Sequence, residues 1–227
     1  MLRKTSGHFF AFLLAPALGL LSFTGLHDSP FGLRSNSFPP HENYLAVAAP
    51  NLPIGSAIPK ADSRLKDISG KEISLTQARQ ANGLLVMFSC NTCPVVIRNQ
   101  SRTKEICAYA KNKTIGVVLL NANEGDRKGG NSFAAMQDYA KGQGYQWYYA
   151  VDDNSMLADA FGASRTPECF LFDKNGKLVY HGAIDNSPGD PAKITRHHLA
   201  EAINEMTAGK EVSVKETRSI GCSISRL

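Results

Sequence analysis

A run of five apolar residues, Leu84 to Phe88, stands just before two closely spaced cysteines. The turn signal Asn82-Gly83 precedes the run, so the pattern predicts a short, fully buried strand. From Val95 to Lys113 apolar residues recur at helical spacing, which predicts a long helix. Cys90 and Cys93 therefore stand where a strand ends and a helix begins.

This placement favours thiol chemistry at the two cysteines. Positions i and i+3 of a helix share a face, so the sulfurs of Cys90 and Cys93 could close a disulfide. Unpaired N–H groups and the positive end of the helix dipole favour a thiolate, which is the reactive form. The spacing predicts a redox-active disulfide between Cys90 and Cys93. Inert buried thiols and a structural metal site are the alternatives. We predict no metal, because there is no second Cys-x-x-Cys and no nearby Cys/His pair.

Composition limits the other functional classes. The chain has 227 residues and is 43% hydrophobic, enough for one domain with extra segments or for two small domains. The net charge of +5 is scattered, without a basic run interleaved with aromatics, so no nucleic-acid partner is predicted. The glycine-containing segment 121–131 lacks phosphate-loop spacing, and no cofactor is predicted. Five cysteines, an odd number, favour one reactive pair plus individual thiols.

The first 51 residues are organised differently from the rest. Arg3 and Lys4 precede an uncharged, apolar stretch from Phe9 to Leu26. This pattern predicts a signal peptide over residues 1–26, with an uncleaved membrane anchor as the alternative. Residues 27–51 are rich in proline and lack periodicity, which indicates a flexible linker. We therefore expect an exported protein, periplasmic or otherwise extracytoplasmic, with its folded domain over 52–209 and a C-terminal tail over 210–227.

Strand and helix patterns alternate through the folded domain. This order predicts an α/β three-layer sandwich, with a central mixed sheet flanked by helices, parallel central strands and an antiparallel edge. Besides the strand and helix around the cysteines, we expect a hairpin at 64–75 turning at Gly70, strands at 115–120, 147–151, 165–173 and 178–182, and helices at 76–80, 132–143, 155–161 and 191–208. The helix at 155–161 should be capped by Asp152 or Asp153.

Three motifs give the chain a resemblance to the thioredoxin-like superfamily. They are Cys90-Asn91-Thr92-Cys93-Pro94 after a strand, Thr166-Pro167 before a later strand, and Phe170-Leu171-Phe172-Asp173 with Gly176-Lys177. More closely, the chain is similar to the redoxin branch (the alkyl-hydroperoxide-reductase and thiol-antioxidant type) and to thioredoxin-like reductases exported to bacterial envelopes. The resemblance implies a thioredoxin-like fold over roughly Leu52 to Gly209.

The resemblance also implies roles for particular residues. It implies a cis bond between Thr166 and Pro167, with the proline packed beside the disulfide and backbone exposed for a peptide substrate. The catalytic residues would be Cys90, Cys93 and Pro167. The substrate groove would be formed by Ser89, Asn91, Thr92 and Thr166. Ser89 stands where a thioredoxin has tryptophan, Asn91-Thr92 replaces its Gly-Pro, and no counterpart of its buried carboxylate is identified.

The function that we expect is thiol–disulfide oxidoreduction. The Cys90 thiolate would attack a disulfide-containing protein substrate, Cys93 would resolve the mixed disulfide, and a thiol electron donor would be the second partner. The alternative is a peroxiredoxin-like thiol peroxidase (an antioxidant), although Cys90 stands where its Thr-x-x-Cys pattern needs threonine. A metal-binding chaperone using Cys90, Cys93 and His181 is a third hypothesis. Its support is weak, because we expect His181 to be an exposed strand residue.

The remaining cysteines are expected to be structural or are left without a role. Cys107 lies fourteen positions beyond Cys93. In a continuous helix that is about 21 Å along the axis, so we expect Cys107 to be a buried structural thiol. We expect Cys222 to be a partly buried structural thiol, with a third redox thiol as the alternative. The sequence assigns no role to Cys169.

Overall fold

The computed structural model describes residues 51–227. The predicted signal or anchor segment, and the predicted linker up to its last residue, lie outside the described residues. Within residues 51–227, no helix is both long enough and apolar enough to cross a membrane.

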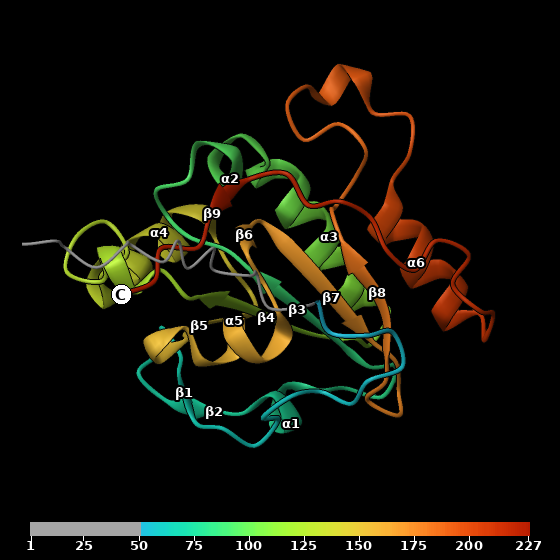
Figure 1. Cartoon of the computed structure of the whole chain (residues 1–227), viewed down its shortest axis with the longest axis horizontal. Coiled ribbons are helices and arrows are strands. Elements are labelled where there is room, and N and C mark those ends of the chain that lie inside the picture. Colours follow the sequence, from blue (N-terminus) through green and yellow to red (C-terminus); the bar gives the residue numbers. More distant parts are fainter. Residues whose placement is uncertain (1–50) are drawn as a thin grey trace, which may run out of the picture. The chain divides into compact units, whose positions relative to one another are not determined.

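The described part of the chain is built on a five-stranded mixed sheet, in the order β5-β4-β3-β7-β8 (Figure 1). The central strand β3 (Leu84–Phe88) is parallel to β4 (Gly116–Asn121), which is parallel to β5 (Tyr148–Val151). On its other side β3 is antiparallel to β7 (Glu168–Phe172), which is antiparallel to β8 (Leu178–Gly182). The predicted mixed sheet is confirmed.

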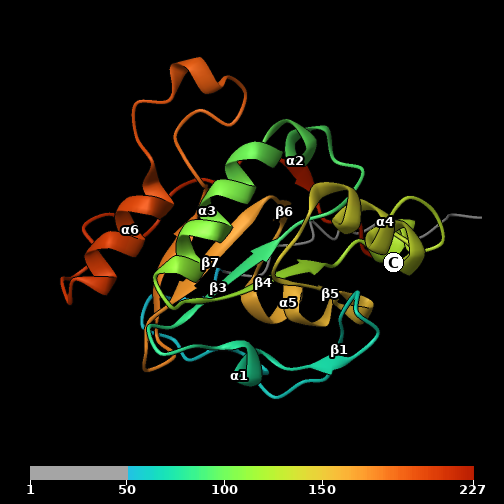
Figure 2. The same ribbon diagram turned by 180° about the vertical axis from the view of Figure 1, so that it is seen from behind.

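Helices cover both faces of this sheet (Figures 1 and 2). Every residue of β3, β4 and β7 is buried, because alternate side chains enter two separate cores. One core lies between the sheet and helices α3 (Gln100–Asn112), α4 (Phe133–Gln143) and α6 (His198–Thr207). The other lies between the sheet and helices α1 (Leu75–Ala78) and α5 (Met156–Phe161). The predicted three-layer architecture is thereby confirmed.

Short polar motifs fix the ends of several elements. Strands β1 (Leu65–Lys66) and β2 (Glu72–Ile73) form the predicted hairpin, with Gly70 at a φ of 82° in its turn. Ser74 caps α1 through a capping box with Gln77. Of the two predicted capping residues of α5, Asp152 has this role, because its carboxylate accepts the N–H groups of residues 157 and 158, each at 2.8 Å.

The helix predicted from Val95 to Lys113 is divided in two. It forms α2 (Pro94–Arg98) and α3, which meet at Asn99. The Asn99 side chain donates to the carbonyl oxygen of Val95 at 2.7 Å and to that of Pro188 at 3.1 Å. A side chain that competes for carbonyl oxygens interrupts a helix, and helical spacing of apolar residues does not reveal this interruption.

The helix predicted over 191–208 starts later than expected. A 3-10 turn, η3 (Pro191–Lys193), comes first, and α6 begins at His198. The Asn186 side-chain oxygen accepts the N–H groups of Thr195 and Arg196, both at 3.1 Å, and holds them outside the helix. Two further 3-10 turns, η1 (Glu124–Asp126) and η2 (Asp153–Ser155), precede α4 and α5.

The strand predicted over 165–173 is also interrupted. Its first part, β6 (Arg165–Thr166), leaves the main sheet at Pro167 and pairs with β9 (Cys222–Ser223) of the C-terminal tail. Proline has no N–H for a sheet ladder, so a break at this position is expected. The pairing with β9 was not predicted, because its partner lies more than fifty residues away in sequence.

Close packing of β4 against α1 gives a testable prediction. A Cβ on Gly116 would overlap the backbone carbonyl oxygen of Ala78. We expect Gly116→Ala to lower the free energy of unfolding by about 1–3 kcal/mol, because backbone has to shift. The matched control is Gly142→Ala in α4, where a Cβ meets no atom within 4 Å. Helix propensity should make that variant more stable by about 0.5–1 kcal/mol. Chemical denaturation measures both, and equal effects would contradict the prediction.

Candidate functional site

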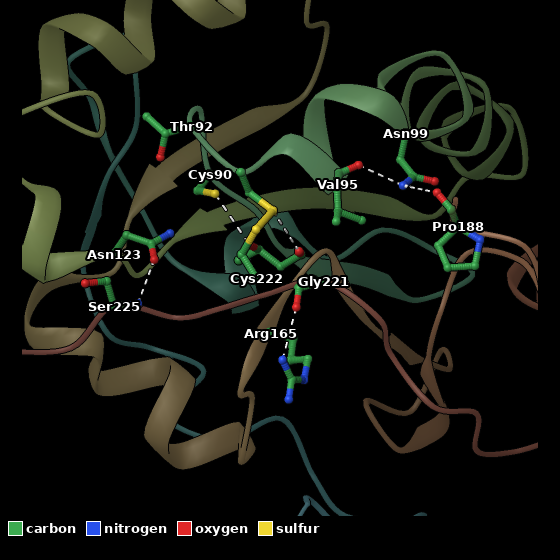
Figure 3. The surroundings of a disulfide bond; sticks show 12 residues. Cys90, Thr92, Val95, Asn99, Asn123, Arg165, Pro188, Gly221, Cys222 and Ser225 are labelled. Carbon is green, nitrogen blue, oxygen red and sulfur yellow. Dashed lines mark hydrogen bonds between the residues drawn. A yellow bond between two sulfur atoms is a disulfide. The ribbon is translucent and has the colours of Figure 1, made fainter. Parts of the chain in front are cut away.

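Three of the five cysteines gather where the tail crosses the end of the sheet. Cys90 follows β3, Cys93 is the N-cap of α2, and Cys222 begins β9. Cys93 and Cys222 form a disulfide, with their Cα atoms 6.0 Å apart although they are 129 positions apart in sequence. Cys90 keeps a free thiol beside that bond (Figure 3).

This arrangement differs from two expectations. The predicted Cys90–Cys93 disulfide is not the bond in this structure, because Cys93 is joined to Cys222. The expectation of an unpaired structural thiol at Cys222 was wrong for the same reason. Local spacing identified two cysteines on one helix turn, whereas the third partner is brought in by a strand pairing that spacing cannot reveal. For another redox state, the Cys90–Cys93 disulfide stays a prediction.

Thr166 contacts all three of these cysteines. Its bond to Pro167 is cis, as predicted. Its hydroxyl lies 3.4 Å from the Cys90 sulfur, and its carbonyl oxygen lies 3.5 Å from the Cys93 sulfur. The latter is a packing contact, because a sulfur in a disulfide carries no proton. The backbone of Thr166 pairs with Cys222. Thr166 is therefore the residue around which the sulfur atoms are arranged.

The side chain of Asn131 forms hydrogen bonds to both residues between Cys90 and Cys93, which are Asn91 and Thr92. Its side-chain oxygen accepts the N–H of Asn91 at 3.0 Å and the amide of Asn121 at 2.8 Å. Its amide nitrogen donates to the hydroxyl of Thr92 at 3.1 Å and to a carboxylate oxygen of Asp126 at 2.8 Å. Asn131 is only 1% exposed, so these bonds replace those that water would make.

Tyr149 completes this polar network. Its hydroxyl donates to the side-chain oxygen of Asn91 at 2.8 Å and accepts from Asn121 at 3.0 Å. Burial raises the pKa of Tyr149 well above its usual value, so the phenol stays protonated as a donor. Asn91 and Thr92, predicted to line a groove, are thus positioned by buried groups from β4 and β5 and from the loop at 122–132.

The predicted site residues differ in their exposure. Thr92 is exposed and Asn91 half-buried. Ser89, Cys90 and Cys93 are only 2–3% exposed, and Pro167 is buried. The backbone N–H of Ser89 donates to the carbonyl oxygen of Leu120 at 2.8 Å, which extends the pairing of β3 with β4. In this conformation, external molecules reach neither Cys90 nor Cys93 directly.

Sequence reasoning missed a buried acid–histidine pair next to Pro167. Glu168 and His181 are each 3% exposed, and a carboxylate oxygen lies 2.7 Å from His181 Nε2. The other carboxylate oxygen accepts the N–H groups of Ser164 at 2.8 Å and Arg165 at 3.0 Å, which fixes the chain entering β6. His181 is therefore not the exposed residue that we expected. An acidic residue directly after Thr-Pro was the available signal.

The other two cysteines lie inside the core. Cys107 and Cys169 are completely buried between the sheet and the α3 layer. Burial raises the pKa of both thiols, so neither forms a thiolate readily. The prediction of a buried thiol at Cys107 is confirmed. Among the described residues, no three His, Cys, Asp or Glu side chains are grouped so that they could hold a metal ion.

Comparison with known proteins places the chain in a family. The family model described as Redoxin matches residues 53–199, well over half of the chain. The chain belongs to the redoxin family. This membership agrees with the resemblance seen in the sequence and with the strand–Cys-x-x-Cys–helix arrangement described above.

Similar solved structures support the fold. A hypothetical protein from Sinorhizobium meliloti 1021 is 29% identical with a TM-score of 0.72, covering 78% of this chain and 97% of that one. A thioredoxin-like protein in the oxidized form is 18% identical with a TM-score of 0.55, covering 70% of this chain and 100% of that one. The fold of this redoxin is thus thioredoxin-like, as predicted.

A curated relative is also similar over part of its length. The thiol-disulfide oxidoreductase ResA of Bacillus thuringiensis (strain Al Hakam) is 25% identical over 113 residues. The match covers 50% of this chain and 61% of that relative, so it extends over less than two thirds of the relative's length.

The position of Asn131 gives a prediction about the site. In Asn131→Ala the N–H of Asn91 and the amide of Asn121 would lose a buried acceptor. We expect the free energy of unfolding to fall by about 1–3 kcal/mol. The reduced protein should also show an altered rate of Cys90 alkylation. Asn112→Ala, at an exposed position in α3, is the control and should change stability by less than about 0.5 kcal/mol. An Asn131 variant as stable as that control would contradict the assignment.

Proposed function

We propose that this redoxin is a thiol–disulfide oxidoreductase that acts on protein disulfides through Cys90 and Cys93. One observation carries the proposal: the free Cys90 thiol lies beside a disulfide made by Cys93, and both sulfurs contact Thr166. A cysteine next to a formed disulfide is the arrangement that thiol–disulfide exchange requires. The name of the curated relative, thiol-disulfide oxidoreductase, supports the same class of reaction.

The proposed reaction has two exchange steps, once Cys93 has been freed by reduction. The Cys90 thiolate attacks one sulfur of the substrate disulfide, which forms a mixed disulfide and releases one substrate thiolate. The Cys93 thiolate then attacks the Cys90 sulfur, closes the Cys90–Cys93 disulfide and releases the second substrate thiolate. Two electrons pass to the substrate, and a thiol electron donor returns the enzyme to its dithiol form.

Local groups support the role of Cys90 as the attacking thiol. The Thr166 hydroxyl, 3.4 Å away, can donate to the Cys90 sulfur, and such a hydrogen bond is stronger when the acceptor is charged. The Asn131 network fixes the backbone between Cys90 and Cys93. Cys107 and Cys169 are completely buried in the core, which raises the pKa of both thiols. Pro167, Ser89, Asn91, Thr92 and Thr166 are proposed to shape the substrate groove.

The proposed setting is the cell envelope. Its support is the basic start followed by the uncharged apolar stretch Phe9–Leu26, which is typical of an export signal or an N-terminal anchor. The partners would then be an extracytoplasmic protein with a disulfide and a thiol electron donor. We propose residues 52–209 as the redox domain of the exported chain.

Activity measurements test the proposal. Cys90→Ser should lose reduction of insulin disulfides to the background rate with dithiothreitol as electron donor, because the attacking sulfur is gone. Cys107→Ala removes a thiol that is buried in the core and should retain the wild-type rate. Loss of activity in the control, or full activity in Cys90→Ser, would exclude this assignment. Rapid turnover of a hydroperoxide with none of insulin would favour the thiol peroxidase alternative.

The hydroxyl next to Cys90 gives a second prediction. Thr166→Val removes that donor and keeps the side-chain shape. A hydrogen bond to a charged group contributes about 1.5–3 kcal/mol, so alkylation of reduced Cys90 at neutral pH should slow by about tenfold or more. Thr166→Ser keeps a hydroxyl and should react at nearly the wild-type rate. Equal slowing in both variants would point to packing instead of hydrogen bonding.

A further inference from the structure

The C-terminal tail carries a cysteine into the site while its backbone pairs with the site as an added strand. We propose that Cys222 is a third redox cysteine and that the tail docks as an intramolecular substrate on Thr166. In this scheme the Cys93–Cys222 disulfide exchanges with a Cys90–Cys93 disulfide. The inference rests on the proposed function and extends it.

The docking of the tail has the form of peptide binding by strand addition. Thr166 pairs with Cys222 and Arg165 with Ser223, antiparallel. The N–H of Ile224 donates to the carbonyl oxygen of Ser164 at 3.0 Å and lengthens the ladder. An extended segment that adds a strand to an exposed backbone edge is a general mode of peptide recognition. Here the bound segment belongs to the same chain.

Gly221 permits an unusually close approach. A Cβ at this position would overlap the carbonyl oxygen of Thr166 and press against the nitrogen of Pro167. The Arg165 guanidinium donates to the carbonyl oxygen of Gly221 at 3.1 Å (Figure 3). Only glycine lets the tail backbone lie this close to the Thr166–Pro167 bond, and the disulfide-forming residue follows directly.

Contacts on either side hold the tail without a covalent bond. Before the site, the N–H of Thr217 donates to the carbonyl oxygen of His181 at 3.0 Å. After the site, the N–H of Ser225 donates to the side chain of Asn123 at 2.7 Å (Figure 3). Between these points Ile220 is 52% exposed. Ile224, in contrast, is 5% exposed and belongs to the core on the α5 side of the sheet. Release of the tail therefore breaks several hydrogen bonds and withdraws this side chain from the core.

Burial determines which of the three cysteines an external molecule meets first. With the tail docked, Cys90 and Cys93 are each 3% exposed, whereas Cys222 is half-buried. A thiol must be reached by its partner to exchange. An external thiol or disulfide therefore meets Cys222 first, and the inner pair reacts with large molecules only after the tail has left.

The exchange conserves atoms and electrons. The Cys90 thiolate attacks the Cys93 sulfur, the Cys93–Cys222 bond breaks, and Cys222 leaves as a thiolate that takes up the proton given by Cys90. One disulfide is replaced by another, so no oxidant or reductant is needed. The closed state is the one in this structure. The open state holds the disulfide that the Cys-x-x-Cys spacing predicts, with the tail free to leave the groove.

Disulfide mapping tests the exchange independently of activity. The oxidised full chain is quenched in acid, alkylated with N-ethylmaleimide, digested and analysed by mass spectrometry. We expect both linkages in the wild type, only Cys93–Cys222 in Cys90→Ala, and only Cys90–Cys93 in Cys222→Ala. The wild type is sampled at several times of incubation and at several concentrations of added thiol. If it shows the same single linkage in every sample, the inference is overturned. The absence of a Cys90–Cys93 bond in Cys222→Ala would also overturn it.

A second pair of variants tests the docking. Gly221→Ala should raise the ratio of Cys90–Cys93 to Cys93–Cys222 by about tenfold, equivalent to roughly 1.4 kcal/mol of lost docking free energy. Ser223→Ala, in the same strand with an exposed side chain, should leave the ratio at the wild-type value. An unchanged ratio in Gly221→Ala, or an equal shift in both variants, would overturn the docking role.

The two proposals can fail separately. If both linkages exchange but reduced wild-type protein does not reduce insulin, the relay stands and the proposed function fails. If insulin is reduced and Cys222 never leaves Cys93 in the oxidised chain, the oxidoreductase stands and the relay fails.

Discussion

The antiparallel register between β3 and β7 is the constraint on which the site depends. Phe88 is paired with Glu168, so the residues after β3 and before β7 meet at one end of the sheet. Cys90 and Thr166, which are 76 positions apart in sequence, are thereby brought within 3.4 Å. A shift of this register by one residue would turn each β7 side chain to the opposite face and would move Thr166 away from the sulfur.

Position in the fold divides the five cysteines of this redoxin into two groups. Cys107 and Cys169 lie in the core between the sheet and its helices, where burial raises their pKa. Cys90, Cys93 and Cys222 lie together at the end of the sheet, next to the backbone and hydroxyl groups of Thr166. The Asn131 network binds the dipeptide between the first two of them. The fold thus encloses two thiols in the core and brings the other three cysteines together, which is the arrangement that the proposed exchange needs.

Local sequence patterns predicted most strands of the sheet. They did not predict the features that depend on contacts between distant segments. The apolar runs of β3 and β4 follow from neighbouring residues, and the structure has both strands as expected. The break at Asn99 and the late start of α6 depend on side chains that bind carbonyl or N–H groups across loops. The burial of His181 depends on Glu168, a partner on the adjacent strand.

By itself, the sequence determined the family resemblance, the layered α/β architecture and the pair of cysteines at a strand–helix junction. These follow from apolar periodicity and from spacing within a few residues. Only the tertiary structure decided which sulfur Cys93 is bonded to, because Cys222 arrives from 129 positions away through the pairing of β6 with β9. That pairing is made by backbone groups, which every residue carries, so no pattern of side chains in the sequence predicts it.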